Sequence, residues 1–251
     1  MKTKTYTRFI VLSAPRSGSN HLIHFLNSHP NIVSYGEPFQ PTFLLGNPSI
    51  TIFENPKFFL FFKYFRNFIP LFFVKQFIFK KYPAHIRAVG FKIFYEHAHI
   101  GYLQNVWAHL AKDRSLKIIH LQRKNMLHSY ISLQTALKTG DFISFIPRYR
   151  NDQVKVTLDY QACKNYFLQV ETWQETYNHH FSEQSIIHID YEHLCQNPSK
   201  ELNKIQKFLG VPIRKLSSPL KKQSLGTPWK NVINYDELKE QFSKSRWTHF
   251  F

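Results

Sequence analysis

The sequence is poor in cysteine and glycine. Its 251 residues include two cysteines, Cys163 and Cys195, which stand far apart and outside any C-x-x-C pair. Such spacing is typical of neither a disulfide framework nor a zinc site. The eight glycines exclude a collagen-like or linker-like chain, and an aromatic content of 17% excludes a disordered one.

Long apolar runs are also absent. Lys2, Lys4 and Arg8 would suit the basic start of a signal peptide, but the apolar residues 9–12 that follow are interrupted at Ser13 and Pro15. Nowhere do about 18 apolar residues follow one another, so the sequence predicts no transmembrane helix. We therefore expect a cytoplasmic protein.

Acidic residues are scarce relative to basic ones. There are 33 lysines and arginines against 16 aspartates and glutamates, which gives a formal net charge of +17. Such a chain favours an anionic partner, which could be a nucleotide, a nucleic acid or an anionic membrane surface. Lysines and arginines are spread along the chain, and no RNA-binding signature is present, so we expect no nucleic-acid partner.

Short apolar segments alternate with segments of helical periodicity, which indicates an α/β fold with a central parallel sheet flanked by helices. The predicted strands are 9–12, 31–35, 87–94, 116–121 and 185–189, and the clearest helices are 22–26, 124–137, 158–180 and 198–209. The length of 251 residues suits a single domain, 1–251.

Residues 53–81 interrupt this alternation. They contain eleven phenylalanines and six basic residues, with Glu54 as the only acid, and Pro70 divides them into two predicted short helices. This Phe-rich insertion is compatible with amphipathic helices packed over the sheet, with a lid that stacks on a sugar or lipid acceptor, or with a membrane-surface element. The sequence leaves these three alternatives open.

The loop after the first predicted strand has the composition of a phosphate site. Residues 15–20 read P-R-S-G-S-N and lead into a helix, whose N-terminal amides and dipole favour an anion. Gly18 permits close approach of the backbone, Ser17 and Ser19 offer hydroxyl donors, and Arg16 offers charge. The alternative is a helix that Ser17 or Ser19 caps and that binds nothing. The Walker pattern is absent, which disfavours a magnesium-dependent ATPase or kinase.

The wider stretch S-A-P-R-S-G-S-N-H-L at 13–22, with L-N-S-H-P at 26–30 and Y-G-E-P-F at 35–39, resembles the start of sulfotransferases that use 3′-phosphoadenosine 5′-phosphosulfate (PAPS). It is most similar to the bacterial carbohydrate and glycolipid branch, since the aryl branch carries Lys where this chain has Arg16. The resemblance implies a P-loop-like three-layer fold. It also implies that Arg16, Ser17, Gly18, Ser19 and Asn20 bind the 5′-phosphosulfate.

Three further segments resemble the same family: 121–133, 189–210 and 221–231. They imply that Arg123 and Ser132 bind the 3′-phosphate, with Ser129 as a rival serine, and that Tyr191 lies on the adenine side. Lys221 and Lys222 would cover the 3′-phosphate, although Gln223 stands where the family usually has Gly. Residues 214–251 would then form a C-terminal loop and helix over the donor.

Sulfuryl transfer needs a base for the acceptor hydroxyl and cations for the leaving phosphate. Glu37 is the predicted base, because it follows the second strand at the sheet edge where such folds bind ligands, and the resembled branch uses a glutamate there. The alternative is a surface or capping carboxylate, with His97 as a substitute base. Arg16 would hold the transferring sulfonate, and Lys92 would stabilise the leaving group or orient the acceptor unless it is solvated near a strand end.

The expected function is therefore transfer of a sulfuryl group from PAPS to a hydroxyl of a carbohydrate or glycolipid. We expect no metal, because the histidines form no ligand motif. The protein could also contact the inner face of the membrane through residues 53–81. A nucleotide-dependent kinase and a non-catalytic basic module that binds nucleic acid or membrane are the rival hypotheses.

Overall fold

A central parallel β-sheet organises the molecule. The computed structural model describes residues 6–40, 64–140, 154–220 and 228–251. The sheet order is β2-β3-β1-β4-β5, and every pairing is parallel. The strands are β1 (Thr7–Ser13), β2 (Ile32–Tyr35), β3 (Ala88–Phe94), β4 (Lys117–Gln122) and β5 (Ser185–Asp190). All five predicted strands are confirmed, with bounds that differ by at most two residues.

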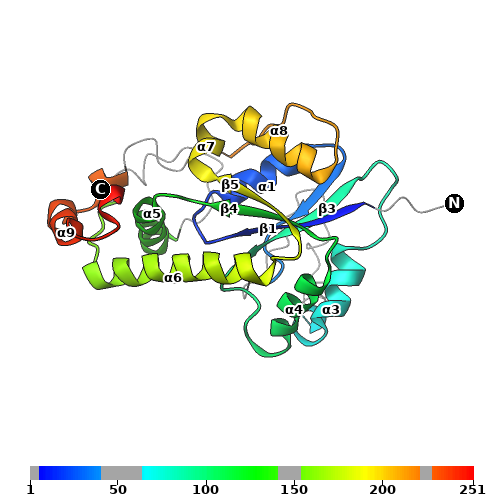
Figure 1. Ribbon diagram of the computed structural model, residues 1–251, viewed down its shortest axis with the longest axis horizontal. Helices are drawn as coiled ribbons and strands as arrows, with labels where there is room; N and C mark the ends of the chain where they lie inside the picture. Colours follow the sequence, from blue (N-terminus) through cyan, green and yellow to red (C-terminus); the bar gives the residue numbers. More distant parts are fainter. Residues whose placement is uncertain (1–5, 41–63, 141–153, 221–227) are drawn as a thin grey trace.

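Helices cover both faces of the sheet, which confirms the predicted three-layer fold. The described α-helices are α1 (Ser19–Asn27), α3 (Pro70–Phe73), α4 (Asn105–Lys112), α5 (Met126–Thr139), α6 (Tyr160–His180), α7 (Tyr191–Gln196), α8 (Pro198–Leu209) and α9 (Tyr235–Phe242). Helices α1, α7 and α8 lie over one face, and α3, α4 and α6 lie over the other (Figure 1). None of the helices in the described ranges is long and apolar enough to cross a membrane.

Alternate side chains of β1 enter two separate hydrophobic cores, as expected when successive strand residues point to opposite faces. Phe9 and Val11 pack in the core beneath α1 and α8. Ile10 and Leu12 pack in the core shared by α3, α4, α5 and α6. Because both faces of β1 are buried, the strand is a near-continuous apolar run, and the polar loop that follows it is held rigidly at the sheet edge.

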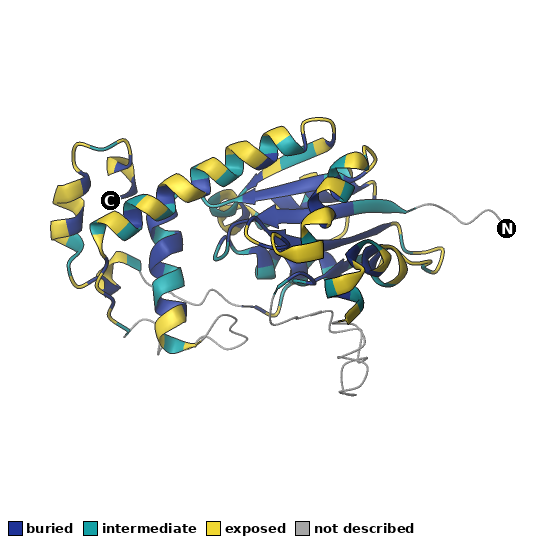
Figure 2. Ribbon diagram, turned by 90° about the horizontal axis from the view of Figure 1, so that it is seen from below, coloured by how far each residue is buried: buried dark blue, intermediate teal, exposed yellow. Residues whose placement is uncertain are grey.

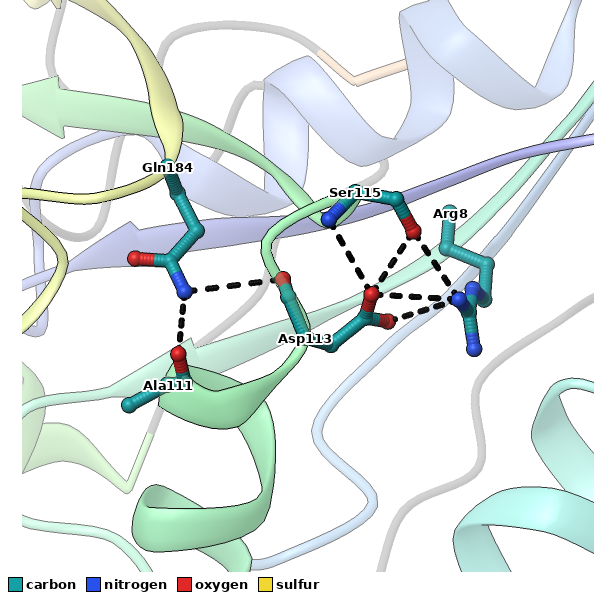
Figure 3. Close-up of polar contacts among 5 residues, drawn as sticks. All are labelled: Arg8, Ala111, Asp113, Ser115 and Gln184. Carbon is teal, nitrogen blue, oxygen red and sulfur yellow. Dashed lines mark hydrogen bonds and ion pairs between the residues drawn. The ribbon is translucent and has the colours of Figure 1, made fainter.

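A polar network fixes the opposite edge of the sheet, where the strands begin (Figure 3). Asp113, after α4, forms an ion pair with Arg8 at 2.9 Å and accepts hydrogen bonds from both the amide and the hydroxyl of Ser115. Gln184, just before β5, donates to the carbonyl oxygen of Ala111. These contacts join the starts of β1, β4 and β5 and leave the carboxyl ends of the strands for function.

The chain returns at its C-terminus to pack on α6. Phe242 of α9 contacts the rings of Phe167 and Tyr160, and Trp247 donates its indole N–H to Glu171. Figure 2 shows α9 beside the end of α6 that lies away from the sheet. Helix α9 thus lies within the predicted C-terminal segment 214–251, whereas Lys221 and Lys222 lie outside the described residues.

The described part of the Phe-rich insertion confirms that Pro70 separates two helical pieces. Residues 64–68 are helical, Ile69 is not, and α3 begins at Pro70 and continues into π-helical Val74–Ile78. Proline suits the first turn of a helix because the N–H that it lacks would have no partner there. Residues 53–63 of the insertion lie outside the residues that the structure describes.

Candidate active site

The loop between β1 and α1 holds two residues in left-handed backbone conformation. Arg16 has φ of 63° and Gly18 has φ of 80°. For a non-glycine residue such as Arg16 this conformation is strained, and strain of this kind concentrates at functional sites. No side chain of the described residues caps the N-terminus of α1, so the alternative of a Ser17 or Ser19 cap is wrong. Ser17 and Ser19 are both buried in the loop.

Tyr191, the first residue of α7, packs directly on Gly18. A Cβ atom at position 18 would lie 2.3 Å from two ring carbons of Tyr191, so only glycine fits there. Arg123 lies in the loop between β4 and α5, and its guanidinium is 4.9 Å from the ring centroid of Tyr191. Three segments that are far apart in the sequence therefore meet at the first loop.

Arg16 and Arg123 are joined around this loop. Arg123 Nη1 donates to the carbonyl oxygen of Arg16 at 3.1 Å, and Arg16 Nε donates to Ser132 Oγ at 3.0 Å. Ser129 is engaged elsewhere, because its hydroxyl donates to the Pro15 carbonyl and accepts from Tyr166. Ser132 therefore lies beside Arg16, whereas Ser129 holds the loop against α6.

The two arginines make this loop suitable for an anion. Burial, and to a lesser extent the nearby charge of Arg123, lowers the pKa of Arg16 to about 10. In the described part of the chain, Arg123 Nε is buried without a hydrogen-bond partner. A buried guanidinium donor of this kind is costly unless a further acceptor is present, and a phosphate oxygen would provide one.

The start of α5, which follows Arg123, is held from two sides. Asn125 caps the helix by accepting from the His128 amide, and its side-chain amide donates to the Phe250 carbonyl. Glu192 accepts from the amides of Lys124 and Asn125 at 3.1 and 3.2 Å. Neither Asn125 nor Glu192 was among the predicted site residues. The N-cap pattern would have found Asn125, but no sequence signal links Glu192 to residues so distant.

A narrow cavity lies beneath the loop. Its lining comes from the carboxyl ends of β1 and β4 and from α5 and α6, and it includes Ser17, Arg123, Ser129 and Tyr166. Carboxyl ends of parallel strands are where open α/β sheets bind ligands. The position of the cavity agrees with the site that the loop residues define.

On the other side of β1, Lys92 and Glu37 form a buried ion pair. Lys92 Nζ on β3 lies 2.5 Å from Glu37 Oε1 in the turn after β2, and it also donates to Asn20 Oδ1 on α1. The Lys92 side chain is fully buried and that of Glu37 is 13% exposed. The alternatives of a solvated Lys92 and of a surface Glu37 are therefore both wrong.

The electrostatics of this pair depend on its burial. Desolvation lowers the pKa of Lys92, and nearby Glu37 opposes the effect while Arg16 adds to it. Removing one member of a buried pair costs about 3–5 kcal/mol, because the other charge is left without compensation. Because Asn20 lies at the start of α1, its contact with Lys92 holds the Glu37–Lys92 pair close to the Arg16 loop.

Two further titratable groups follow β3. His97 is buried, its Nδ1 accepts from the Phe94 amide, and burial lowers its pKa to about 4. Glu96, which was not among the predicted site residues, is exposed as a whole residue. Desolvation of its carboxyl group, with a smaller contribution from nearby Glu37, nevertheless raises its pKa to about 7. His97 thus stands as a neutral imidazole.

No group of three or more histidine, cysteine, aspartate or glutamate side chains that could hold a metal ion is found in the described ranges. Cys163 is buried and Cys195 is exposed, and both are free thiols. The arrangement instead combines an arginine-rich loop with a buried carboxylate–ammonium pair. It can bind a doubly phosphorylated or sulfated anion on one side and accept a proton on the other.

Comparison with known proteins assigns the family. The model of the sulfotransferase domain matches residues 6–248. Nodulation protein H of Rhizobium tropici is 30% identical over 249 residues, which cover 97% of this chain and 92% of that protein. Nodulation protein H of Rhizobium meliloti strain 1021 is 25% identical over 258 residues, which cover 97% and 94%. The chain therefore belongs to the sulfotransferase family.

Two solved structures share the fold. A sulfotransferase from Alicyclobacillus acidocaldarius aligns with a TM-score of 0.50 and 16% identity, covering 96% of this chain and 90% of that one. A mouse sulfotransferase complexed with PAP aligns with a TM-score of 0.50 and 17% identity, covering 98% and 88%. The P-loop-like fold expected from the sequence is thereby confirmed.

Proposed function

We propose that this sulfotransferase transfers a sulfuryl group from PAPS to a hydroxyl of a carbohydrate or glycolipid, with Glu37 as general base. The observation that carries the proposal is the buried Glu37–Lys92 ion pair, which Asn20 joins to the arginine loop. A carboxylate is thus available for the acceptor proton beside cations for the leaving group. The proposal treats residues 1–251 as one sulfotransferase domain.

On the donor side, Arg16 with residues 17–20 would bind the phosphosulfate, and Arg123 with Ser132 would bind the 3′-phosphate. Among the described residues the buried Nε of Arg123 has no hydrogen-bond partner, and Arg16 donates to Ser132; both observations support this division. Tyr191 would contact the adenine. Lys221 and Lys222 belong to the same proposal through the resemblance of their segment alone.

In the reaction, Glu37 accepts the proton of the acceptor hydroxyl as that oxygen attacks sulfur. The S–O bond to the phosphate breaks, and the electron pair remains on the phosphate oxygen. Lys92 then loses its anionic partner as Glu37 becomes protonated, so its charge is available to the developing phosphate charge nearby, together with Arg16. The positive charge of Lys92 is therefore balanced by the Glu37 carboxylate before proton transfer and by the phosphate after it.

The acceptor is proposed to be a carbohydrate or glycolipid because the first loop and Glu37 resemble the bacterial carbohydrate branch. His97 is a weaker candidate for the base, since its Nδ1 already accepts from the Phe94 amide and its ring is buried. A protein of this kind would work at the cytoplasmic side of the membrane, with peripheral contact through the Phe-rich insertion when the acceptor is lipid-linked.

The test of the base is Glu37→Gln, which keeps the shape of the side chain but cannot accept the proton. We expect kcat to fall by about 10²–10⁴ with nearly unchanged donor affinity. Because Gln leaves the buried Lys92 charge unpaired, the matched control is the double variant Glu37→Gln/Lys92→Met, which restores stability but not activity. Retention of most activity by Glu37→Gln would refute Glu37 as the base and leave His97 as the next candidate.

Donor recognition is tested separately by thermal melting with adenosine 3′,5′-bisphosphate, ATP or a short oligonucleotide. The proposal predicts that the bisphosphate alone raises the midpoint appreciably. A rise with ATP alone would favour a kinase, and a rise with the oligonucleotide alone would favour a nucleic-acid-binding module.

A further inference from the structure

The described end of the Phe-rich insertion presents a row of exposed apolar side chains. Tyr64, Phe68, Ile69 and Phe72 are 55%, 56%, 45% and 42% exposed. These four large apolar residues lie within nine positions of the sequence, and the rings of Tyr64 and Phe68 are in contact. Such grouping differs from the scattered exposure that is normal on protein surfaces. We call these four residues the aromatic patch.

Half-buried and buried rings of the same segment lie next to the aromatic patch. The ring centroids of Tyr64 and Phe68 are 4.9 Å apart, and exposed Phe72 lies 5.3 Å from half-buried Phe65. Phe73, in the next position, is fully buried in the core. The same short helices thus anchor one face in the protein and leave the opposite face to solvent, which is the arrangement of an interfacial amphipathic helix.

The surroundings of the aromatic patch are cationic. Between Tyr64 and Lys112 the sequence contains one acidic residue, Glu96, which lies in the turn after β3. Asp113, which follows Lys112, forms an ion pair with Arg8. Lys75, three residues after Phe72, is exposed and close enough to His109 of α4 to lower the pKa of that imidazole, although burial contributes more. Lys112 at the end of α4 is exposed as well, and α4 lies beside α3 (Figure 1).

The aromatic patch is also tied to the turn that carries Glu37. Arg66 is buried and belongs to the helical residues 64–68, and its Nη1 donates to the Gln40 carbonyl at 2.5 Å. The amide of Gln40 in turn donates to the carbonyl of Glu37. A surface that binds the aromatic patch would therefore lie close to the acceptor side of the site.

We propose that the aromatic patch, together with the exposed Lys75 and Lys112 on the neighbouring helical segments, docks the enzyme on a bilayer surface that contains anionic lipid. Aromatic side chains partition into the interface, and nearby lysines are attracted to anionic headgroups. The orientation given by Arg66 brings a lipid-linked acceptor to Glu37. This second role of the patch rests on the proposed glycolipid acceptor, whereas docking itself requires neither donor nor acceptor.

Charge favours a bilayer over a second copy of the chain. Two copies that met through this surface would bring their lysines together, and like charges in one interface are unfavourable. An anionic membrane would instead neutralise them. The net charge of +17 adds a long-range attraction to the same surface.

The test is co-sedimentation with vesicles of phosphatidylcholine, with and without phosphatidylglycerol, in the absence of donor and acceptor. Wild type should bind the anionic vesicles. The variant Phe68→Ser/Phe72→Ser should bind them about ten-fold more weakly or worse, because two half-exposed rings are lost. The variant Lys75→Glu/Lys112→Glu should lose the preference for anionic vesicles.

The matched control is Ile213→Ser/Ile233→Ser, which removes two residues of similar exposure (51% and 67%) elsewhere on the surface. It should bind vesicles like wild type. All variants should sulfate a water-soluble acceptor normally, so a failure of docking is distinguishable from a failure of the proposed activity. Equal binding by wild type and Phe68→Ser/Phe72→Ser, no binding by wild type, or a wild-type dimer that this variant dissociates would overturn the proposal.

Discussion

Replacement of Gly18 by alanine tests the contact between the first loop and Tyr191. Gly18 has φ of 80°, and a Cβ atom there would lie 2.3 Å from Tyr191 Cδ2 and Cε2. The substitution therefore combines two penalties, a left-handed backbone and a steric clash. Gly210, after α8, has φ of 73°, but no atom of the described residues lies within 4 Å of its Cβ position, so Gly210→Ala carries the first penalty alone.

The magnitudes separate these two penalties. A left-handed alanine costs about 1–2 kcal/mol, and the stiffer unfolded chain offsets about half of that, so Gly210→Ala should lose about 1 kcal/mol. Overpacking adds about 1–3 kcal/mol, which gives about 2–4 kcal/mol for Gly18→Ala. For a chain of this size the midpoints should fall by about 2–4 °C and about 4–16 °C respectively.

Thermal melting and denaturant titration measure both variants, and calorimetry with adenosine 3′,5′-bisphosphate measures the donor site. Gly18→Ala should also weaken bisphosphate binding, because Tyr191 must move, whereas Gly210→Ala should leave it unchanged. The variant Gly18→Ala/Tyr191→Ala removes the clash, so it should be more stable than the sum of the single losses predicts. Equal destabilisation by Gly18→Ala and Gly210→Ala would refute the packing of Tyr191 on the loop.

Two more predictions concern the donor site and acid stability. Arg123→Ala should weaken bisphosphate binding by about 2–4 kcal/mol in calorimetry, and an unchanged affinity would remove Arg123 from the site. His120, buried against Tyr95 Oη, has its pKa lowered by burial to about 4, so its contribution to stability is present above pH 6.5 and is lost as the pH falls towards 4. Between pH 6.5 and 4 the free energy of unfolding of wild type, measured by denaturant titration, should therefore fall by on the order of 3 kcal/mol more than that of His120→Gln. His97 keeps part of this pH dependence in both proteins. An equal fall in the two proteins would contradict this assignment.

The strands and the first loop could be predicted because their signals are local. An apolar run followed by P-R-S-G-S-N reports a buried strand and a polar turn without reference to the rest of the chain. The same holds for α8, whose end at Leu209 before Gly210 follows from the left-handed conformation of that glycine. The boundaries of α5 and α6 shifted by two residues because Asn125 and Asp159 cap them.

Most contacts of the site could not be predicted from local patterns, because they join residues that are distant in sequence. Asn20 was expected on the donor side, and nothing in the loop indicates that its amide oxygen accepts from Lys92, 72 residues further on. Lys92 itself could be solvated or paired from its sequence alone. Its complete burial is set by β3 lying between β2 and β1, which is a property of sheet order rather than of composition.

The central claim is sulfuryl transfer from PAPS to a carbohydrate hydroxyl, and mass spectrometry of the products tests it most directly. The enzyme would be incubated with PAPS and a panel of oligosaccharide and glycolipid acceptors, beside Glu37→Gln/Lys92→Met as the folded but inactive control. We expect at least one acceptor to gain the mass of one sulfuryl group with wild type alone, with one adenosine 3′,5′-bisphosphate formed for each product. Phosphorylated product from ATP, or equal sulfation by the control variant, would contradict the account.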